Sequence, residues 1–475
     1  MNDLGVRSGL PAASGVQELI ALARAAQAVA NDYDQARVDE LVAAAGWAII
    51  EPARNRELAE LAVADTGIGN VDDKIKKNFR KTLGLLRDLK AARSVGVIAE
   101  YPAQGIIEIA RPVGVVAAIT PSTNPAATPA NKIINALKGR NAVIVAPSPK
   151  GWTTCARLLQ FIHAQFDRIG APRDLVQMLP APVTKDSTFE LMRQADLVVA
   201  TGSQANVRAA YASGTPAFGV GAGNVAAIVD ETADVAAAAQ MIVRSKIFDN
   251  ATSCSSENSV VLLDAIYTSA LDALKSEGAV LLAADAKDRL QQTMWPDGKL
   301  SAGVIGQSAA TLAQRAGLTS IAAQNPRALL VEENGVGPGH PFSGEKLSPV
   351  LTVYRACDFE DAMRIVERIY SFIGAGHSVG LHSARNDRAL ALGLRLPVSR
   401  VIVNQAHCIA TGGSFDNGLP FSLSMGCGTW GRNNFSDNMN YRHYLNITRV
   451  SSTIPERVPT EQEIFGDYFS RHGRA

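Results

Sequence analysis

From residue 114 onward, short apolar runs alternate with longer stretches in which apolar residues recur at helical spacing. The runs are rich in Val, Ile, Leu and Ala and occupy residues 115–119, 142–145, 175–178, 197–200 and 225–229. Such runs predict buried strands, and the stretches between them predict helices on both faces of a parallel sheet. A second alternating unit extends from about residue 235 to 405. The pattern indicates an α/β protein with two parallel-sheet domains and ligands at the carboxyl ends of the strands.

The first part of the chain has a different character. Residues 15–93 carry helical periodicity, whereas residues 95–110 alternate around the turn Pro-Ala-Gln-Gly and predict a β-hairpin. A hairpin outside a parallel sheet presents unpaired edges that often pair with another subunit. We therefore expect an oligomerisation hairpin in a homodimer or homotetramer.

The length and charge balance of the chain exclude several classes of function. The 475 residues exceed what one hydrophobic core usually holds, and 46 basic residues nearly cancel 45 acidic ones. This balance gives no attraction to nucleic acid or to an anionic membrane, and no apolar run reaches the ~20 residues of a membrane helix. The five scattered cysteines favour neither a disulfide framework nor a metal site. With no signal-peptide pattern at the start, a cytoplasmic location is expected.

A polar loop at residues 248–259 carries Cys254 between a predicted helix and a predicted strand. Hydrogen-bond donors in a Ser/Thr/Asn setting favour the thiolate, which is the nucleophilic form of cysteine. We interpret Cys254 as a nucleophile that attacks a carbonyl carbon. The alternative is a small, inert, partly buried cysteine.

Three further features carry candidate chemistry. The turn Thr201-Gly202-Ser203 follows a strand and opens a helix, so its backbone N–H groups could meet phosphate, although no GxGxxG motif is present. His377 and His407 are either proton carriers or structural histidines, the commoner case. Cys408 and Cys427 are expected to be packing residues.

Several blocks, in one order along the chain, resemble the CoA-acylating branch of the aldehyde dehydrogenases. The blocks lie at residues 119–125, 200–203, 219–224, 250–257, 344–350 and 426–431. The resemblance covers residues 15 to 450 and implies the two-domain fold of that family. It implies a cofactor-binding domain at 1–94 and 111–230, a hairpin at 95–110, a catalytic domain at 231–410 and a returning tail at 411–475.

The resemblance also assigns roles. Cys254 would form a thiohemiacetal whose oxyanion is met by the Asn124 amide and by the Cys254 N–H, where each donor can contribute ~3–4 kcal/mol. Glu345 would hold the nicotinamide ribose. The remaining positions expected to bind NAD or NADP are Thr120, Pro121, Pro147, Thr201, Gly202, Ser203 and Gly221. The alternatives without a catalytic or binding role are a helix cap for Asn124 and a solvated surface carboxylate for Glu345.

Two departures from the hydrolytic dehydrogenases are informative. Val220 stands where those enzymes carry a glutamate general base, and a valine cannot accept a proton from water. The acyl thioester should then persist until coenzyme A accepts the acyl group. The second departure is the segment Ala-Pro-Ser-Pro at residues 146–149, where many relatives have Lys-x-x-Glu, so the choice between NAD and NADP stays open.

Arg432 and Asn433 occupy the loop after Trp430, where acetaldehyde-type relatives have Gly-Asn. An arginine there predicts an anionic substituent on the aldehyde, although it could instead face solvent or a CoA phosphate. Residues 435–443 are also similar to acylating enzymes for sulfoacetaldehyde. The expected reaction is oxidation of sulfoacetaldehyde to sulfoacetyl-CoA, with succinate semialdehyde or acetaldehyde as alternatives. An acyl-phosphate reductase and a non-catalytic assembly protein are the alternatives from other classes.

Overall fold

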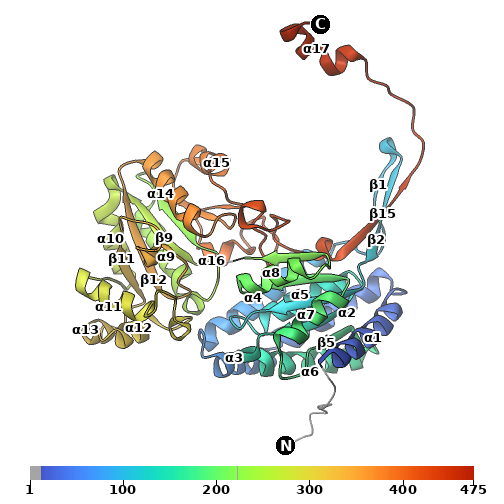
Figure 1. Ribbon diagram of the computed structural model, residues 1–475, viewed down its shortest axis with the longest axis horizontal. Coiled ribbons are helices and arrows are strands. Elements are labelled where there is room, and N and C mark those ends of the chain that lie inside the picture. Colours follow the sequence, from blue (N-terminus) through green and yellow to red (C-terminus); the bar gives the residue numbers. More distant parts are fainter. Residues whose placement is uncertain (1–11, 222, 475) are drawn as a thin grey trace, which may run out of the picture.

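A computed structural model describes residues 12–221 and 223–474 of the chain, and two α/β lobes lie side by side in it (Figure 1). The first lobe holds a five-stranded parallel sheet in the order β5-β4-β3-β6-β7. Its strands are β3 (Val115–Thr120), β4 (Ala142–Pro147), β5 (Val176–Met178), β6 (Leu197–Thr201) and β7 (Ala217–Val220). All six residues of β3 are buried, which is the expected burial for a central strand covered on both faces.

Eight helices of the described chain cover this sheet. They are α1 (Ala12–Ala30), α2 (Gln35–Ile50), α3 (Pro52–Thr66), α4 (Val71–Leu89), α5 (Ala127–Lys138), α6 (Trp152–Ile169), α7 (Lys185–Gln194) and α8 (Gln204–Ala212). Every residue of α5 is buried, because the helix packs against β3 and β4 on one side and against α2 and α4 on the other. The N-terminal helices thus complete the core of this lobe, and α4 faces the second lobe.

The second lobe holds a seven-stranded parallel sheet in the order β10-β11-β12-β9-β8-β13-β14. Its strands are β8 (Val225–Val229), β9 (Glu257–Leu263), β10 (Ala279–Leu281), β11 (Ala328–Glu332), β12 (Val350–Ala356), β13 (Val379–His382) and β14 (Val401–Val403). Its helices are α9 (Val235–Ile247), α10 (Tyr267–Ser276), α11 (Ala284–Met294), α12 (Ala309–Arg315), α13 (Thr319–Ala322), α14 (Phe359–Phe372), α15 (Asn386–Arg395) and α16 (His407–Ala410).

The predicted domain boundary at residue 230 is wrong. Strand β8 was expected to end the cofactor-binding sheet, but it pairs with β9 and β13 in the second sheet. The fifth strand of the first sheet is β7, which the apolar pattern did not reveal because two of its four residues are Ala and Gly. The chain therefore changes lobes at residues 221–224, immediately before β8.

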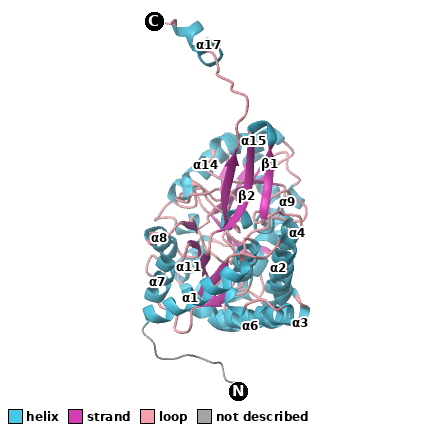
Figure 2. Ribbon diagram, turned by 90° about the vertical axis from the view of Figure 1, so that its right-hand side faces the viewer, coloured by secondary structure: helices cyan, strands magenta, loops and turns pink. Residues whose placement is uncertain are grey.

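The predicted hairpin is present as β1 (Gly96–Tyr101) and β2 (Ile106–Pro112), and β15 (Leu445–Ser451) adds a third antiparallel strand beside β2. Beyond β15, the chain leads to α17 (Glu461–His472), which stands away from both lobes (Figure 2). No helix within the described residues is long and apolar enough to cross a membrane.

Candidate active site

The loop that carries Cys254 begins with an unusual backbone. Asp249, Asn250 and Ala251 follow α9 with φ angles of 50°, 52° and 61°. The left-handed conformation costs roughly 1–2 kcal/mol for each residue that has a Cβ, so three in succession require compensation from their surroundings. The Asn250 amide donates to the Gly306 carbonyl oxygen at 2.9 Å, which is one such compensating contact.

Asp249 supplies most of the compensation. Its buried carboxylate lies 3.1 Å from Lys74 Nζ and 2.5 Å from Lys77 Nζ, both on α4 of the other lobe. It also accepts from the Thr252 hydroxyl at 2.8 Å and from the Asn70 N–H at 3.1 Å. Helix α4 therefore fixes the turn that leads into Cys254. Opposite charges nearby hold the pKa of Asp249 below its ordinary value, against the effect of burial.

The sulfur of Cys254 faces a histidine. Cys254 Sγ lies 3.4 Å from His377 Nε2, and His377 Nδ1 lies 2.7 Å from the Ser378 hydroxyl. Burial, followed by the charge of Arg400, lowers the pKa of His377 well below 6.5, so its ring is neutral at pH 7. A neutral ring with Nδ1–H donating to Ser378 leaves Nε2 as an acceptor for the thiol proton. His377 therefore occupies the position of a general base, whereas its structural role was the commoner expectation.

The expected thiolate-favouring loop is a prediction that the structure corrects. Burial raises the pKa of Cys254 to about 12, and the nearby Glu345 adds to this rise. At neutral pH the side chain is therefore a thiol, and activation depends on an adjacent base. His407, the second candidate, has Nδ1 2.8 Å from the Ser255 carbonyl oxygen and braces the loop from the other side.

Two glycines allow the close approach of backbone around this pair. A Cβ at Gly376 would lie 2.0 Å from the Cys427 carbonyl oxygen, and a Cβ at Gly223 would lie 2.0 Å from the Cys254 carbonyl oxygen. Any side chain at either position would displace His377 or the nucleophile loop. Buried Arg400 ties the histidine segment to the C-terminal loop, since it donates to the carbonyl oxygens of His377 at 3.2 Å and Gly426 at 2.9 Å.

Asn124 has a fixed amide orientation. Its Oδ1 accepts from Lys77 Nζ at 2.8 Å, the same ammonium group that pairs with Asp249. Because Oδ1 meets the cation, the amide NH₂ is the side available to an oxygen acceptor, and it makes only a long contact of 3.4 Å to the Thr123 hydroxyl. This orientation suits the predicted oxyanion role better than the helix-cap alternative, since α5 has no side-chain cap.

Glu345 lies near the sulfur. Burial raises the pKa of its carboxyl group to about 8, with the Gly223 N–H and the ammonium groups of Lys246 and Lys346 opposing the rise. The loop that presents it is held by Lys346 Nζ, which donates to the carbonyl oxygens of Phe342 at 2.6 Å and Gly344 at 3.0 Å. The Glu345 side chain is thus partly buried, in a loop held by hydrogen bonds.

The residues predicted for the nucleotide gather at one edge of the first sheet. Thr120, Pro147 and Thr201 end the neighbouring strands β3, β4 and β6. Ser203 caps α8 by accepting from the Asn206 N–H at 3.3 Å. A Cβ on Gly202, which has φ 150°, would contact the Pro121 ring at 3.8 Å. The hydroxyl of Thr120 is buried without a hydrogen-bond partner among the described residues, and an orphaned polar atom at this edge fits a ligand.

Gly221 and Val220 lie where the chain changes lobes. Gly221 is buried beside the C-terminal loop, and a Cβ there would lie 3.8 Å from the Gly431 carbonyl oxygen. Val220 is 2% exposed at the end of β7 and brings no carboxylate to the site.

Arg432 and Asn433, which were predicted to bind the substrate, lie on the C-terminal loop. Arg432 is exposed with φ 58°, and it does not line the cavity next to Asn124. The Asn433 amide is used within its own loop, because Oδ1 accepts from the Cys427 N–H at 2.9 Å and Nδ2 donates to the Gly431 carbonyl oxygen at 3.3 Å. Asn433 therefore braces its own loop through both ends of its amide.

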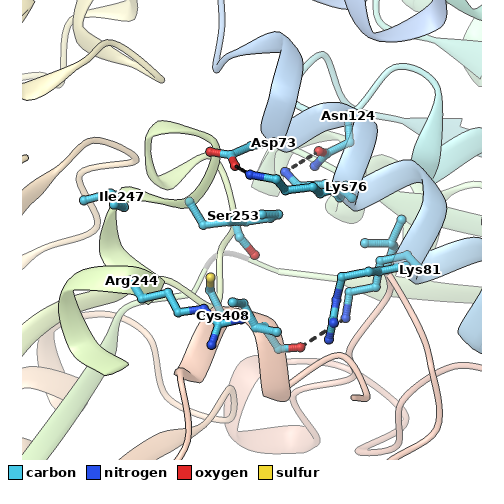
Figure 3. Close-up of a pocket in the computed structure, with 13 residues that line it drawn as sticks. Asp73, Lys76, Lys81, Asn124, Arg244, Ile247, Ser253 and Cys408 are labelled. Carbon is cyan, nitrogen blue, oxygen red and sulfur yellow. Dashed lines mark hydrogen bonds and ion pairs between the residues drawn. The ribbon is translucent and has the colours of Figure 1, made fainter. Parts of the chain in front are cut away.

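A cavity of about 340 Å³ lies between Asn124 and Ser253 (Figure 3). Its lining contains five cationic side chains and one carboxylate: Lys76, Lys77, Arg80, Lys81, Arg244 and Asp73. The helical periodicity of residues 15–93 did not indicate that α4 would face the Cys254 loop. The cavity cations and Arg400 are the functional candidates that the sequence reasoning missed.

A nucleophilic cysteine beside a neutral imidazole and an oriented amide, between two parallel-sheet lobes, defines the class of protein. The chain belongs to the aldehyde dehydrogenase family, whose model matches residues 10–294. The predicted resemblance to the acylating, oxidoreductase branch is confirmed by its relatives. The chain is 67% identical to the acylating sulfoacetaldehyde dehydrogenase of Cupriavidus necator, over 99% of this chain and 96% of that protein.

Two further relatives agree. An acylating sulfoacetaldehyde dehydrogenase of Bilophila wadsworthia is 43% identical, over 97% of this chain and 99% of that protein. The crystal structure of an acetylating aldehyde dehydrogenase from Geobacillus thermoglucosidasius superposes with a TM-score of 0.90 at 34% identity, covering 94% of this chain and 98% of that one. The predicted aldehyde dehydrogenase fold is thereby confirmed.

Proposed function

We propose that this enzyme oxidises sulfoacetaldehyde to sulfoacetyl-CoA with NAD or NADP. The observation that carries the proposal is the 3.4 Å contact between Cys254 Sγ and the neutral His377 Nε2, next to an amide oriented for an oxyanion. Two relatives named as acylating sulfoacetaldehyde dehydrogenases support the substrate.

The first steps follow from these groups. His377 Nε2 takes the thiol proton while the Cys254 sulfur bonds to the carbonyl carbon. The negative charge that develops on the oxygen meets the Asn124 NH₂ and the Cys254 N–H, and such donors are most effective when they are fixed beforehand. A nicotinamide cofactor bound at the edge formed by Thr120, Pro147 and Thr201 would supply the acceptor for the hydride of this carbon. His377 then releases its proton to solvent, and an acyl thioester remains on Cys254.

The second half of the reaction is transfer of the acyl group from the Cys254 sulfur to the CoA thiol. His377 takes the proton of the CoA thiol, whose sulfur attacks the thioester carbon and displaces the Cys254 sulfur, and His377 returns the proton to Cys254. Val220 offers no base to water, so the thioester is expected to wait for CoA. The nucleotide would be held at the edge formed by Thr120, Pro147 and Thr201, with Glu345 on the nicotinamide ribose.

We infer in addition that the sheet of β1, β2 and β15 joins subunits into a homodimer or homotetramer. Its two edge strands expose apolar side chains, among them Val97, Tyr101 and Val450. Light scattering on the purified protein tests this inference directly.

The reaction is tested by measuring NAD(P)H formation with sulfoacetaldehyde, with and without CoA, and by identifying the product by mass. Sustained turnover that requires CoA and yields a sulfoacetyl thioester is the expected result. Equal steady rates without CoA would identify a hydrolytic enzyme, and phosphate-dependent formation of an acyl phosphate would identify the other class. A higher kcat/KM for succinate semialdehyde than for sulfoacetaldehyde would identify succinate semialdehyde as the substrate, and the proposed reaction steps would stay the same.

A further inference from the structure

We propose that Arg80 and Arg244 bind the anionic group of the aldehyde, a sulfonate, in the cavity beside Asn124 and Ser253. The inference rests on the proposed function and deepens it, because it names the residues that select the substrate. It also replaces the role that the sequence suggested for Arg432.

The cavity is placed to hold the part of the substrate that does not react. Ser253 directly precedes the nucleophile, and Asn124 presents its amide to the oxyanion, so the reacting carbonyl lies at this end of the cavity. The other walls come from α4, from the end of α9 and from α16 (Figure 3). A volume of about 340 Å³ holds a small organic anion, and its lining determines which one.

Three of the five cationic side chains that line the cavity already have partners in the protein or extend into solvent. Lys77 is paired with Asp249 and fixes Asn124. Lys81 directs its ammonium group at three carbonyl oxygens, those of residues 409, 412 and 413, and burial lowers its pKa to about 7. The Lys76 side chain is 64% exposed and lies 3.5 Å from Asp73 Oδ1.

The two arginines keep unused donors. The guanidinium of half-buried Arg80 makes one long hydrogen bond, 3.3 Å to the Ser414 hydroxyl, and packs over the Phe415 ring. Arg244 makes no side-chain hydrogen bond or ion pair with another described residue. Both also line an adjoining cavity of about 320 Å³ that contains the Asp416 carboxylate, so they stand where the two cavities meet.

Geometry favours a tetrahedral anion. Arg244 enters the cavity from α9, on the opposite side from the α4 residues, as its position relative to Lys81 makes visible (Figure 3). Each guanidinium presents paired N–H donors, which match two oxygens of one anion. A sulfonate carries three oxygens that are not coplanar and can meet two such donors from different directions, whereas one guanidinium suffices for a planar carboxylate.

The test compares Arg80→Met and Arg244→Met with the wild-type enzyme, using sulfoacetaldehyde and the neutral propionaldehyde at saturating CoA and NAD(P). We expect kcat/KM for sulfoacetaldehyde to fall about tenfold or more in each variant, as for the loss of a charge-assisted hydrogen bond, and that for propionaldehyde to stay within about twofold. Arg56→Met, an exposed charge on α3, serves as the matched control and should change neither value. Arg244→Lys should recover part of the loss.

A second measurement does not depend on turnover. Ethanesulfonate should bind the resting wild-type enzyme in calorimetry and compete with propionaldehyde, and both variants should bind it about tenfold more weakly. Failure of the wild-type enzyme to bind ethanesulfonate overturns the inference, even where the variants fold poorly. If no aldehyde gives an acyl-CoA, the proposed function fails while this binding result still decides the anion site.

Three kinetic outcomes would also overturn the inference. Equal losses for both aldehydes would assign the arginines a structural role. A raised KM for CoA with an unchanged preference between aldehydes would assign them to CoA phosphates. Loss of the preference in Arg432→Met, with Arg244→Met unaffected, would place the anion site on the C-terminal loop.

Discussion

The two sides of Cys254 use ionisable groups in opposite ways. On the side of the second lobe, burial moves the pKa of His377 well below 6.5 and that of Glu345 up to about 8, so both groups are uncharged at neutral pH. On the side of the cavity, half-buried Arg80 and exposed Arg244 keep their charge, as guanidinium groups do, although burial lowers the pKa of the neighbouring Lys81 to about 7.

The difference follows from what each side has to do. Proton transfer from the thiol needs a base that is free to accept a proton, and burial keeps the His377 ring neutral and therefore able to do so. Recognition of an anion needs charge that persists, which contact with water allows. One loop, from residue 249 to 255, separates the two environments. Variants on either side should therefore have different kinetic signatures.

The largest effect is expected from a substitution of Cys254, which lies between the two environments. Cys254→Ser should lower kcat by roughly a thousandfold or more, because a hydroxyl is a far weaker nucleophile beside the same imidazole. NAD(P)H formation measures the loss, and mass spectrometry with aldehyde but no CoA should find acyl enzyme in the wild type alone. A stoichiometric burst of NAD(P)H in the variant would contradict the role of the sulfur.

On the buried side, His377→Ala should lower kcat/KM at pH 7.5 by about 10²- to 10⁴-fold. The pKa of His377 is lowered, so the wild-type base stays neutral as the pH falls past 6.5, and its rate should decline only at more acidic pH. In the variant the thiol, with a pKa of about 12, has no base, so its rate should rise steadily with pH through 10. Parallel pH profiles for the two enzymes would remove His377 from the proton path.

Between the two sides, Lys77→Met should lower kcat about tenfold and the free energy of unfolding by about 2 kcal/mol. The amide of Asn124 loses its orienting cation, and Asp249 keeps Lys74 as its remaining ion-pair partner among the described residues. Steady-state kinetics and urea unfolding measure the two effects. Lys90→Met, at the exposed end of the same helix, is the control. A loss of stability with unchanged kcat would show that Lys77 only supports the loop.

The smallest effect is expected at Glu345. Its raised pKa, about 8, keeps the carboxyl protonated below that pH, and an ionised carboxylate is the better acceptor for ribose hydroxyls. The wild-type KM for NAD(P) should therefore fall about threefold between pH 7 and 9. Glu345→Gln should give a KM that does not change over this range. A wild-type KM that is flat with pH would separate Glu345 from the nucleotide.

The sequence predicted most elements but not all of their neighbours. Residues 115–119 and 225–229 have the same apolar pattern, yet they lie in different sheets, because local periodicity carries no information about strand partners. Cys254 and Asn124 could be predicted because their loops match motifs of one family. His377 gained its role only from the close approach of Gly376 to the C-terminal loop. The spacing of Lys77, Arg80 and Lys81 places them on one face of a helix. The sequence does not show that this face lies opposite α9, because that depends on how the lobes pack.

The C-terminal arm, residues 452–472, makes none of the contacts described around Cys254, so the arm and the site can be altered independently. Helix α17 has no buried residue, and residues 452–460 before it are exposed and lack helix or strand. Every contact described around Cys254 involves residues before position 439, so proteolytic cleavage within 452–460 would leave the catalytic machinery of a subunit intact. A fluorophore or affinity tag attached after α17 should therefore leave turnover unchanged.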